Sequence, residues 1–266
     1  MEKRIAIALG DFDGMHLAHQ KVITGAENSI IYCVNNRFTL LQKSIFERRF
    51  KNAVFADFNK LRDMSAEEFI NNILIDGFGA GMLLCGYNFR FGKGANWTAL
   101  DLRRYLESKD VWVRILEHLD FEGEPISSSR IRECIKNGEI EKANKMLGYN
   151  FTFENEVISG DSRGRKLGFP TVNQKYPEGM CDIKFGVYES RAEIDGKMYK
   201  AMSNIGIRPS FKVDYPLSET HIIGFNGDLY GKTLRLELVR YIRQEKKFDS
   251  IDKLKEQLIN DKSSII

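Results

Sequence analysis

The pattern of apolar residues changes near Gly148–Asn150, and this change constrains the fold more than any other feature of the chain. Before that point, short apolar runs alternate with segments of helical spacing. Strands that alternate with helices predict a parallel sheet with helices on both faces. After that point, apolar and polar residues alternate with a period of two between turn-forming residues, which predicts an antiparallel sheet closed into a small barrel. We therefore expect two domains, residues 1–148 and 150–266.

The expected elements follow from the same periodicities. In the first domain we expect strands at residues 5–9, 29–34, 53–58, 81–85 and 111–116, and helices at 19–27, 40–50, 65–76, 98–109, 128–137 and 140–147. Ser65 and Glu68 have the spacing of a capping box, which marks the start of one helix. In the second domain we expect strands at 151–159, 186–194, 197–205, 219–225 and 233–242, followed by an amphipathic helix at 250–259.

Composition narrows the class of protein. The 266 residues are 29% charged and have near-average apolar content, so the chain can bury two hydrophobic cores. The net charge is only +3 and arginine and lysine are scattered, so we expect no nucleic-acid partner. The four cysteines lie far apart without metal-binding spacing, and no apolar run approaches a signal peptide or a membrane span. We expect a cytoplasmic protein with reduced, mostly buried thiols, and we leave its oligomeric state open.

A glycine-rich, basic loop occupies Gly160–Asn173. Glycine lets the backbone approach a ligand closely, so successive N–H groups can point at one anion, and Arg165 and Lys166 add charge for phosphate oxygens. Thr171 and Asn173 lie two residues apart, so in an extended segment their oxygens face the same side and suit Mg²⁺ beside a phosphate. Glycine and arginine alone would fit a basic surface hairpin, but the Pro-Thr-x-Asn ending favours a ligand site.

The segment Gly164–Asn173 resembles the ATP-binding signature of riboflavin kinases, with Val172 where that family usually has alanine. Four later segments are similar to the family in order and spacing: Ser203–Phe211, Glu219–Ile222, Phe225–Gly231 and Arg243–Ser250. The resemblance covers nearly all of residues 150–258. It implies ATP as co-substrate, Mg²⁺ as cofactor and riboflavin as phosphoryl acceptor.

The same resemblance implies roles for single residues. Glu219 matches the carboxylate that takes the proton of the flavin's ribityl 5′-hydroxyl, so it is the candidate catalytic base. The alternating pattern alone would explain Glu219 as an outward-facing carboxylate on a half-buried strand. Flavin contacts are implied for Asn204 and Arg243. Nucleotide contacts are implied for Gly164, Arg165, Lys166, Gly168, Phe169, Pro170 and Thr171.

A turn bracketed by glycines follows the first expected strand, within Gly10–Gln20. A strand, a tight turn and a helix start form the usual place for nucleotide phosphates in an α/β sheet. His16 and His19 lie three residues apart at this helix start, where both can reach one phosphate chain, although such histidines are also common as capping or surface residues. A second anion-binding pattern, hydroxyls followed by a cation one turn later, begins the expected helix at 128–137: Ser128, Ser129 and Arg132.

Gly10–Gln20 resembles the His-x-Gly-His motif of nucleotidyltransferases, in the form found in prokaryotic FAD synthetases fused to riboflavin kinase. Gly86–Gly94 is similar to that family's flavin and nucleotide loop, and Ile126–Arg132 to its triphosphate motif. The resemblance implies catalytic roles for His16 and His19. It implies nucleotide contacts for Gly10, Phe12, Asp13, Ser128, Ser129 and Arg132, and flavin contacts for Asn88, Phe89 and Arg90.

Together the motifs predict an α/β nucleotidyltransferase domain with a Rossmann-like parallel sheet, followed by an antiparallel β-barrel riboflavin kinase domain with a C-terminal helix. The leading hypothesis is a bifunctional enzyme that converts riboflavin and ATP to FMN and then FMN and ATP to FAD, releasing pyrophosphate.

Two departures from the family leave alternatives open. Ala18 stands where the family has glycine, and residues 35–39 are all that remains of a longer loop with a Pro-His-Pro segment. One alternative is therefore a riboflavin kinase whose N-terminal domain binds nucleotide or flavin with little activity. The other is a flavin- or nucleotide-binding regulator without turnover, which the intact Glu219, Thr171 and Asn173 argue against.

Overall fold

The computed structural model describes residues 5–35, 37–160, 164, 167–207 and 215–265. It separates into two compact units, Met1–Ser128 and Ser129–Ile266. The first unit carries a parallel sheet and the second an antiparallel barrel, as the change in periodicity predicts. In the described part of the chain, no helix is long and apolar enough to cross a membrane.

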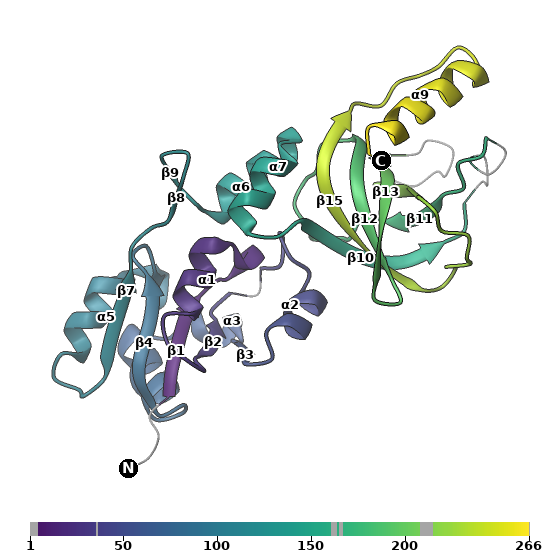
Figure 1. Ribbon diagram of the computed structural model, residues 1–266. Coiled ribbons are helices and arrows are strands. Elements are labelled where there is room, and N and C mark those ends of the chain that lie inside the picture. The colour runs from purple at the N-terminus through teal and green to yellow at the C-terminus, as the bar shows by residue number, and fades with distance from the viewer. Residues whose placement is uncertain (1–4, 36, 161–163, 165–166, 208–214, 266) are drawn as a thin grey trace. The chain divides into compact units, whose positions relative to one another are not determined.

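The first unit is built on a five-stranded parallel sheet with the order β3-β2-β1-β4-β7 (Figure 1). Its strands are β1 (Ile5–Gly10), β2 (Ile30–Cys33), β3 (Ala53–Phe55), β4 (Ala80–Gly86) and β7 (Trp112–Leu116). The chain runs from β1 through β2 to β3 and then returns to the other side of β1 with β4. The strand order therefore reverses at β1, and the carboxyl end of such a strand is the usual ligand crevice of an open α/β sheet.

Helices cover both faces of this sheet, as predicted. They are α1 (Leu17–Ile23), α2 (Lys43–Arg49), α3 (Phe58–Leu61), α4 (Ala66–Glu68), its π-helical continuation η2 (Phe69–Ile75) and α5 (Ala99–Leu106). The side chains of η2 and α5 join Leu9 and Leu83 in one core. The chain after α1 packs at Gly25 against Leu84, which points to the opposite face from its neighbour Leu83.

The predicted capping box is present, since Ser65 Oγ accepts from Glu68 N (3.1 Å) and Glu68 Oε2 accepts from Ser65 N (2.9 Å). Short elements that the sequence did not predict complete the unit: η1 (Asp13–Met15), β5 (Arg90–Phe91), η3 (Lys93–Ala95), β6 (Trp97–Thr98), β8 (Asp120–Phe121) and β9 (Glu124–Pro125). The first helix begins at Leu17 rather than residue 19, because His16 already caps it.

The second unit begins in α6 (Ser128–Asn137) and α7 (Ile140–Leu147), both with the predicted bounds. A closed antiparallel barrel follows, with the strand order β10-β11-β14-β13-β12-β15. Its strands are β10 (Phe151–Ile158), β11 (Val172–Lys175), β12 (Gly186–Ile194), β13 (Lys197–Gly206), β14 (Leu217–Ile222) and β15 (Thr233–Arg243). The predicted barrel is thus confirmed, with β11 as a strand that the sequence did not predict.

The last helix, α9 (Ile251–Ser263), lies against the barrel beside β15 (Figure 1). It ends four residues later than predicted. Its C-terminal end is fastened to the barrel because Arg240 on β15 donates to the carbonyl of Ser264 (2.6 Å) and Lys200 on β13 donates to that of Ile265 (3.0 Å). The helix therefore belongs to the barrel as a fixed wall.

The compact units meet at Ser128 and Ser129, twenty residues before the predicted boundary. The reason lies in α7, where the side-chain amide of Asn144 donates to Leu238 O of β15 (2.9 Å) and accepts from Phe151 N of β10 (2.7 Å). These bonds join α7 to the barrel. A functional boundary at residues 148–150 stays a prediction.

Candidate active sites

A cavity of about 620 Å³ lies against the outer face of the barrel in the second unit. Glu219 and His221 on β14 line this barrel cavity, whereas Thr220 between them points inward and bonds to Ser203 Oγ (2.7 Å). The opposite wall comes from α9 and the segment 244–248 that precedes it. The cavity brings together six predicted site residues: Gly164, Phe169, Thr171, Asn204, Glu219 and Arg243.

Three polar side chains lie in register across neighbouring strands, and two of them, Glu219 and Asn204, line this cavity. Glu219 on β14 pairs with Asn173 on β11 and with Asn204 on β13. Cross-strand partners lie about 4.5–5.5 Å apart and point to the same face, so their oxygens gather around the carboxylate. Glu219 is half-buried, so its side chain is partly accessible from the cavity and partly packed against the neighbouring strands.

In the described part of the glycine-rich loop, Gly164 and residues 167–169 are joined by backbone hydrogen bonds. The carbonyl of Gly164 accepts from Leu167 N (3.0 Å) and Phe169 N (2.9 Å). A side chain on Gly164 would lie 2.3 Å from Phe169 O, and Gly168 has φ +83°, so the turn needs both glycines. The predicted cationic residues of this loop, Arg165 and Lys166, lie outside the described residues.

His221 fastens the end of this turn to the barrel. Its Nδ1 lies 2.9 Å from Pro170 O, and because a carbonyl only accepts, Nδ1 carries the proton. Its ring meets Phe169 edge to face, with centroids 5.2 Å apart. Burial lowers the pKa of His221 below its ordinary value, and nearby Lys262 lowers it further, against the Pro170 bond. The neutral ring thereby holds the turn that presents Thr171 to the cavity.

Asn173 fits the predicted Mg²⁺ site in chemistry and in environment. It is 5% exposed, and its Oδ1 has no hydrogen-bond partner among the residues that the structure describes. A side chain on Gly160 would overlap the amide nitrogen of Asn173 at 2.0 Å, so that glycine makes room for the amide. No cluster of three or more His, Cys, Asp or Glu in the described ranges could hold a metal. The buried amide oxygen of Asn173 and the hydroxyl of Thr171 are the remaining donors, and both are ligands that Mg²⁺ accepts.

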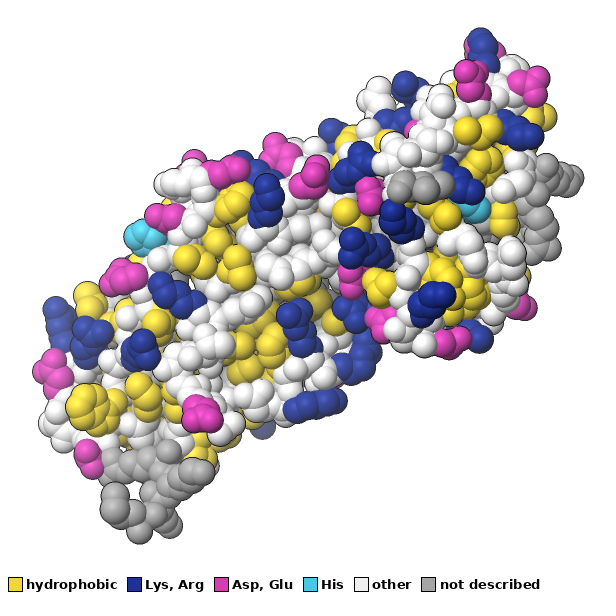
Figure 2. Space-filling view, in the orientation of Figure 1, with side chains coloured by type: hydrophobic (Ala, Val, Ile, Leu, Met, Phe, Trp, Pro, Cys, Tyr) yellow, Lys and Arg dark blue, Asp and Glu magenta, His cyan; other side chains and the backbone are white. Residues whose placement is uncertain are grey.

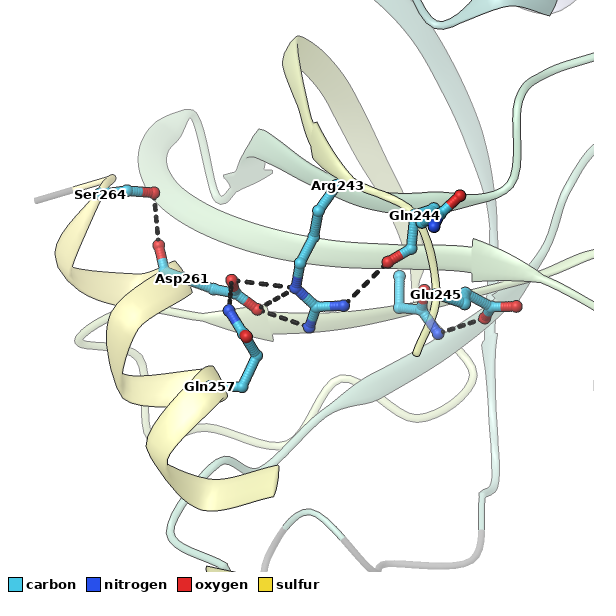
Figure 3. Close-up of polar contacts among 7 residues, drawn as sticks. Arg243, Gln244, Glu245, Gln257, Asp261 and Ser264 are labelled. Carbon is cyan, nitrogen blue, oxygen red and sulfur yellow. Dashed lines mark hydrogen bonds and ion pairs between the residues drawn. The ribbon is translucent and has the colours of Figure 1, made fainter. Parts of the chain in front are cut away.

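Arg243, predicted as a flavin contact, is held by the C-terminal helix. Its guanidinium donates to Asp261 through Nε (3.0 and 3.1 Å) and Nη2 (2.7 Å), and through Nη1 to Gln244 O (3.0 Å) (Figure 3). Asp261 is only 3% exposed and also accepts from Gln257 Nε2 (2.8 Å). The arginine therefore lines the cavity while its donors face α9 and the backbone.

Glu245, two residues further on, bonds to the other side of the cavity. Its carboxylate accepts from Asn204 Nδ2 at 2.8 Å. The opposite atom of that amide, Asn204 Oδ1, is buried without a hydrogen-bond partner in the described part of the chain. The segment after β15 is thus bonded both to α9 and to the strand beside Glu219.

In the first unit, the predicted phosphate turn lies at the carboxyl end of β1, the crevice position of the sheet. Phe12 takes a left-handed conformation (φ 54°) and its ring covers Gly10, where a side chain would lie 3.1 Å from the ring. Gly14 has φ +75° and packs against Leu40. The turn is therefore a fixed structure that leads directly into α1.

His16 and His19 stack at the start of α1, with ring centroids 3.6 Å apart. His16 is the N-cap, and its Nδ1 accepts from His19 N at 3.4 Å. Burial lowers the pKa of His16 to about 4. Burial and the neighbouring His16 lower the pKa of His19 well below its ordinary value, and His19 Nδ1 is buried without a partner among the described residues. Both rings are neutral before substrate arrives.

Asp13 binds the short loop that precedes α2 and is buried (4% exposed). Its carboxylate accepts from Thr39 N (2.9 Å), Thr39 Oγ1 (2.5 Å) and Leu40 N (2.9 Å). These bonds explain why α2 begins at Lys43 instead of residue 40. Ser128 Oγ donates to Asp13 O (3.0 Å), so this serine belongs to the same turn. The Asp13 carboxylate thus holds the shortened loop in place.

The remaining residues predicted for the nucleotidyltransferase site do not lie together in one compact unit. Ser129 and Arg132 lie in the second unit, where Arg132 Nη2 donates to Ser129 Oγ at 3.0 Å. Asn88 and Arg90 are exposed. Phe89, predicted as a flavin contact, is 9% exposed and stacks on Phe91 in the core of the first unit. Its ring therefore contributes to the core of the first unit, and its contact with a flavin stays a prediction.

Sequence reasoning assigned no role to several residues that line the barrel cavity or support its wall: His221, Glu245, Phe248, Leu254, Leu258 and Asp261. His221, Glu245 and Phe248 stand inside matched motifs, which was the available signal. Leu254 and Leu258 lie in the predicted amphipathic helix, whose apolar face was the signal, and Asp261 gave none because the predicted helix ended before it. All four cysteines are buried and free, as expected. Lysine and arginine side chains are spread over both units with acidic side chains among them (Figure 2).

A parallel α/β unit with paired histidines at its ligand crevice, joined to a barrel with a carboxylate in an outer cavity, defines a nucleotide-dependent transferase with two active domains. The riboflavin kinase family model matches residues 147–265, and the FAD synthetase family model matches residues 29–130. The chain belongs to the family of bifunctional riboflavin kinase/FMN adenylyltransferases.

Relatives and one solved structure support this membership over the whole chain. The bifunctional riboflavin kinase/FMN adenylyltransferase of Bacillus subtilis is 31% identical over 100% of this chain and 92% of the relative. That of Buchnera aphidicola subsp. Schizaphis graminum is 33% identical over 96% and 91%. A crystal structure described as a macrolide-efflux protein from Streptococcus pneumoniae matches with a TM-score of 0.88 and 29% identity, covering 100% of this chain and 94% of that one.

Proposed function

We propose that the barrel cavity transfers the γ-phosphoryl group of ATP to the ribityl 5′-hydroxyl of riboflavin, giving FMN and ADP. The first unit then joins FMN to the AMP part of a second ATP, giving FAD and pyrophosphate. The observation that carries the proposal is that Glu219 and Thr171 line one cavity of a size suited to a flavin-like ligand, with Asn173 as the cross-strand partner of Glu219.

In the kinase reaction, Glu219 orients the 5′-hydroxyl and accepts its proton as the oxygen attacks the γ-phosphorus. Thr171 Oγ1 and the unpartnered Asn173 Oδ1 are the groups that would hold Mg²⁺, which neutralises phosphate charge when bound. Gly164 and Phe169, which are bonded to each other, line the nucleotide side of the cavity. Apolar side chains of the opposite wall, among them Leu254 and Leu258, exclude water from the transfer.

In the adenylyl transfer, a phosphate oxygen of FMN attacks the α-phosphorus of ATP and pyrophosphate leaves. His16 and His19 enter this reaction neutral, so each offers one N–H to phosphate oxygens. The charge of a bound triphosphate raises the pKa of both rings again, which strengthens these bonds as charge develops on the leaving group. Asp13 contributes by holding the short loop beside this turn.

One assay tests the proposal. Purified protein is incubated with riboflavin, ATP and Mg²⁺, and FMN and FAD are resolved over time, with pyrophosphate measured in parallel. We expect FMN first and FAD later, and His19→Ala should abolish FAD and pyrophosphate while FMN formation continues. FMN without FAD would support a kinase with an inactive first unit, and the absence of both products would support a binding protein without turnover. A cytoplasmic location stays a prediction.

A further inference from the structure

Asn204 offers the barrel cavity a single buried acceptor whose direction is fixed by one bond. Its Nδ2 donates to a Glu245 oxygen at 2.8 Å. Because a carboxylate only accepts, the nitrogen and not the oxygen of the Asn204 amide must face Glu245. The amide oxygen Oδ1 therefore faces the other way, and it is buried with no hydrogen-bond partner in the described residues.

The position of this acceptor relates it to the reaction. Asn204 on β13 is the cross-strand partner of Glu219 on β14, and both residues line the cavity. An amide oxygen and a carboxylate at neighbouring positions form a surface of acceptors, which suits a chain of hydroxyl donors. A buried acceptor without a partner costs free energy until a ligand supplies a donor. The ribityl chain of riboflavin carries such hydroxyls.

Glu245 is held in place although its side chain is exposed at the cavity mouth. Arg243, two residues before it, is fixed by the buried Asp261 (Figure 3). The carboxylate of Glu245 lies in the space that Gly206 leaves, where a side chain on Gly206 would be 2.6 Å from Glu245 Oε1. The fixed position of Arg243 and the space at Gly206 thus both hold the Glu245 carboxylate where it accepts from Asn204.

We propose that Glu245 is a positioning residue for flavin recognition: it orients Asn204 so that Oδ1 accepts a hydrogen bond from the ribityl chain. Glu245 touches no substrate in this scheme and acts only through Asn204. The inference rests on the proposed riboflavin kinase activity, which it deepens by assigning recognition of the polyhydroxyl chain rather than of the flavin ring.

The test compares two flavins with the same ring. Riboflavin carries the ribityl chain, whereas lumiflavin has a methyl group instead. Both are titrated by fluorescence against wild type, Glu245→Ala, Glu245→Gln and, as a control, Glu256→Gln, which changes an exposed carboxylate on α9. For Glu245→Ala we expect riboflavin affinity to fall about three- to tenfold, the effect of one hydrogen bond, and lumiflavin affinity to stay within about twofold. Glu245→Gln keeps an acceptor and should restore most of the loss.

Two further variants test that Glu245 acts through Asn204. Gly206→Ala keeps the carboxylate but displaces it, so it should reproduce the loss of riboflavin affinity seen for Glu245→Ala. In the double variant Asn204→Ala/Glu245→Ala, riboflavin binding should be no weaker than in Asn204→Ala alone.

Three results would overturn the inference: an equal loss for riboflavin and lumiflavin, no loss in Glu245→Ala, or additive losses in the double variant. Each leaves the proposed function standing if wild type still forms FMN. The proposed function itself would be refuted if wild type formed no FMN and changed riboflavin fluorescence no more than buffer alone does.

Discussion

The buried ion pair between Arg243 and Asp261 joins the cavity wall to α9, so a substitution in this pair tests what holds the wall in place. Asp261→Asn keeps the shape of the side chain and one acceptor oxygen but removes the charge. Asp261 is 3% exposed, and the arginine loses a charged partner at 2.7 Å. Removing one partner of a buried pair costs about 3–5 kcal/mol. Because the arginine keeps its bond to Gln244 O and the asparagine still accepts one bond, we expect about 2–3 kcal/mol here.

The loss should appear both in stability and in flavin binding. Leu254 and Leu258 of α9 line the cavity, so a loosened helix should raise the KM for riboflavin more than the KM for ATP. Urea unfolding and hydrogen exchange of α9 measure the first effect, and FMN formation measures the second. Conversion of added FMN to FAD by the first unit is the internal control and should not change. Asp252→Asn, in the exposed first turn of α9, is the matched control variant.

An apolar replacement separates charge from packing. Replacing a buried ion pair with well-packed hydrophobic residues is often neutral or stabilising. Arg243→Met/Asp261→Leu should therefore recover most of the stability that Asp261→Asn loses, and with it the KM for riboflavin. If Asp261→Asn is as stable as wild type and has the same KM values, the ion pair does not hold the wall and the reasoning fails.

Four further changes test other parts of the molecule. Glu219→Gln should lower kcat for FMN formation by ~10²–10⁴-fold with little change in riboflavin affinity, and a near wild-type rate would remove Glu219 from the mechanism. The pKa of His16 falls to about 4 on folding, so the unfolded state binds more protons between pH 6.5 and 4. His16 alone should therefore lower the stability of the first unit by about 3 kcal/mol as pH falls through that window. His16→Asn should reduce the dependence of the urea midpoint on pH, and the part that remains includes the effect of His19, whose pKa is also lowered. Asn173→Ala should raise the Mg²⁺ concentration needed for half-maximal FMN formation, while unchanged dependence would make its buried oxygen structural. A fragment of residues 129–266 should unfold at higher urea than one of residues 150–266, since only the longer one keeps α7 on the barrel, and equal midpoints would contradict that.

Elements were predictable where the local pattern and the tertiary environment agree. The helices at Ser128–Asn137 and Ile140–Leu147 have the predicted bounds because each has one apolar face and a marked end. The strand Val172–Lys175 escaped prediction because its inward-facing residue is a glutamine, Gln174, which is fully buried and bonds to Asn155 O and Leu234 O. Alternation of apolar and polar residues cannot reveal a strand that buries polar side chains on both faces.

Site residues were also predictable where a local motif contains them, and not where their contacts are distant in the sequence. Glu219 and Thr171 could be predicted because each lies in a short, contiguous sequence motif. The structure brings both to one cavity. The partners of Asp13 lie 26 and 27 residues away, and Asp261 lies 18 residues from Arg243, so no local pattern contains these contacts. Phe89 shows that a residue inside a matched motif can also belong to the core, and its predicted flavin contact stays a prediction. Motifs specify which chemistry is present, and non-local bonds decide which motif residues remain available to a ligand.

The bonds that stabilise the cavity wall are also those that aim its acceptors. Arg243 is bonded to Asp261 of α9, and Glu245, two residues later, accepts from the amide of Asn204, which lines the cavity. A change at Asp261 therefore acts on the apolar wall through the helix, whereas a change at Glu245 acts on one hydrogen bond beside Glu219. If the wall serves the flavin ring and Asn204 the ribityl chain, Asp261→Asn should weaken lumiflavin and riboflavin alike, while Glu245→Ala should weaken riboflavin alone. An equal loss for both flavins at Asp261 and a loss for riboflavin alone at Glu245 is a result that general destabilisation of the barrel could not produce.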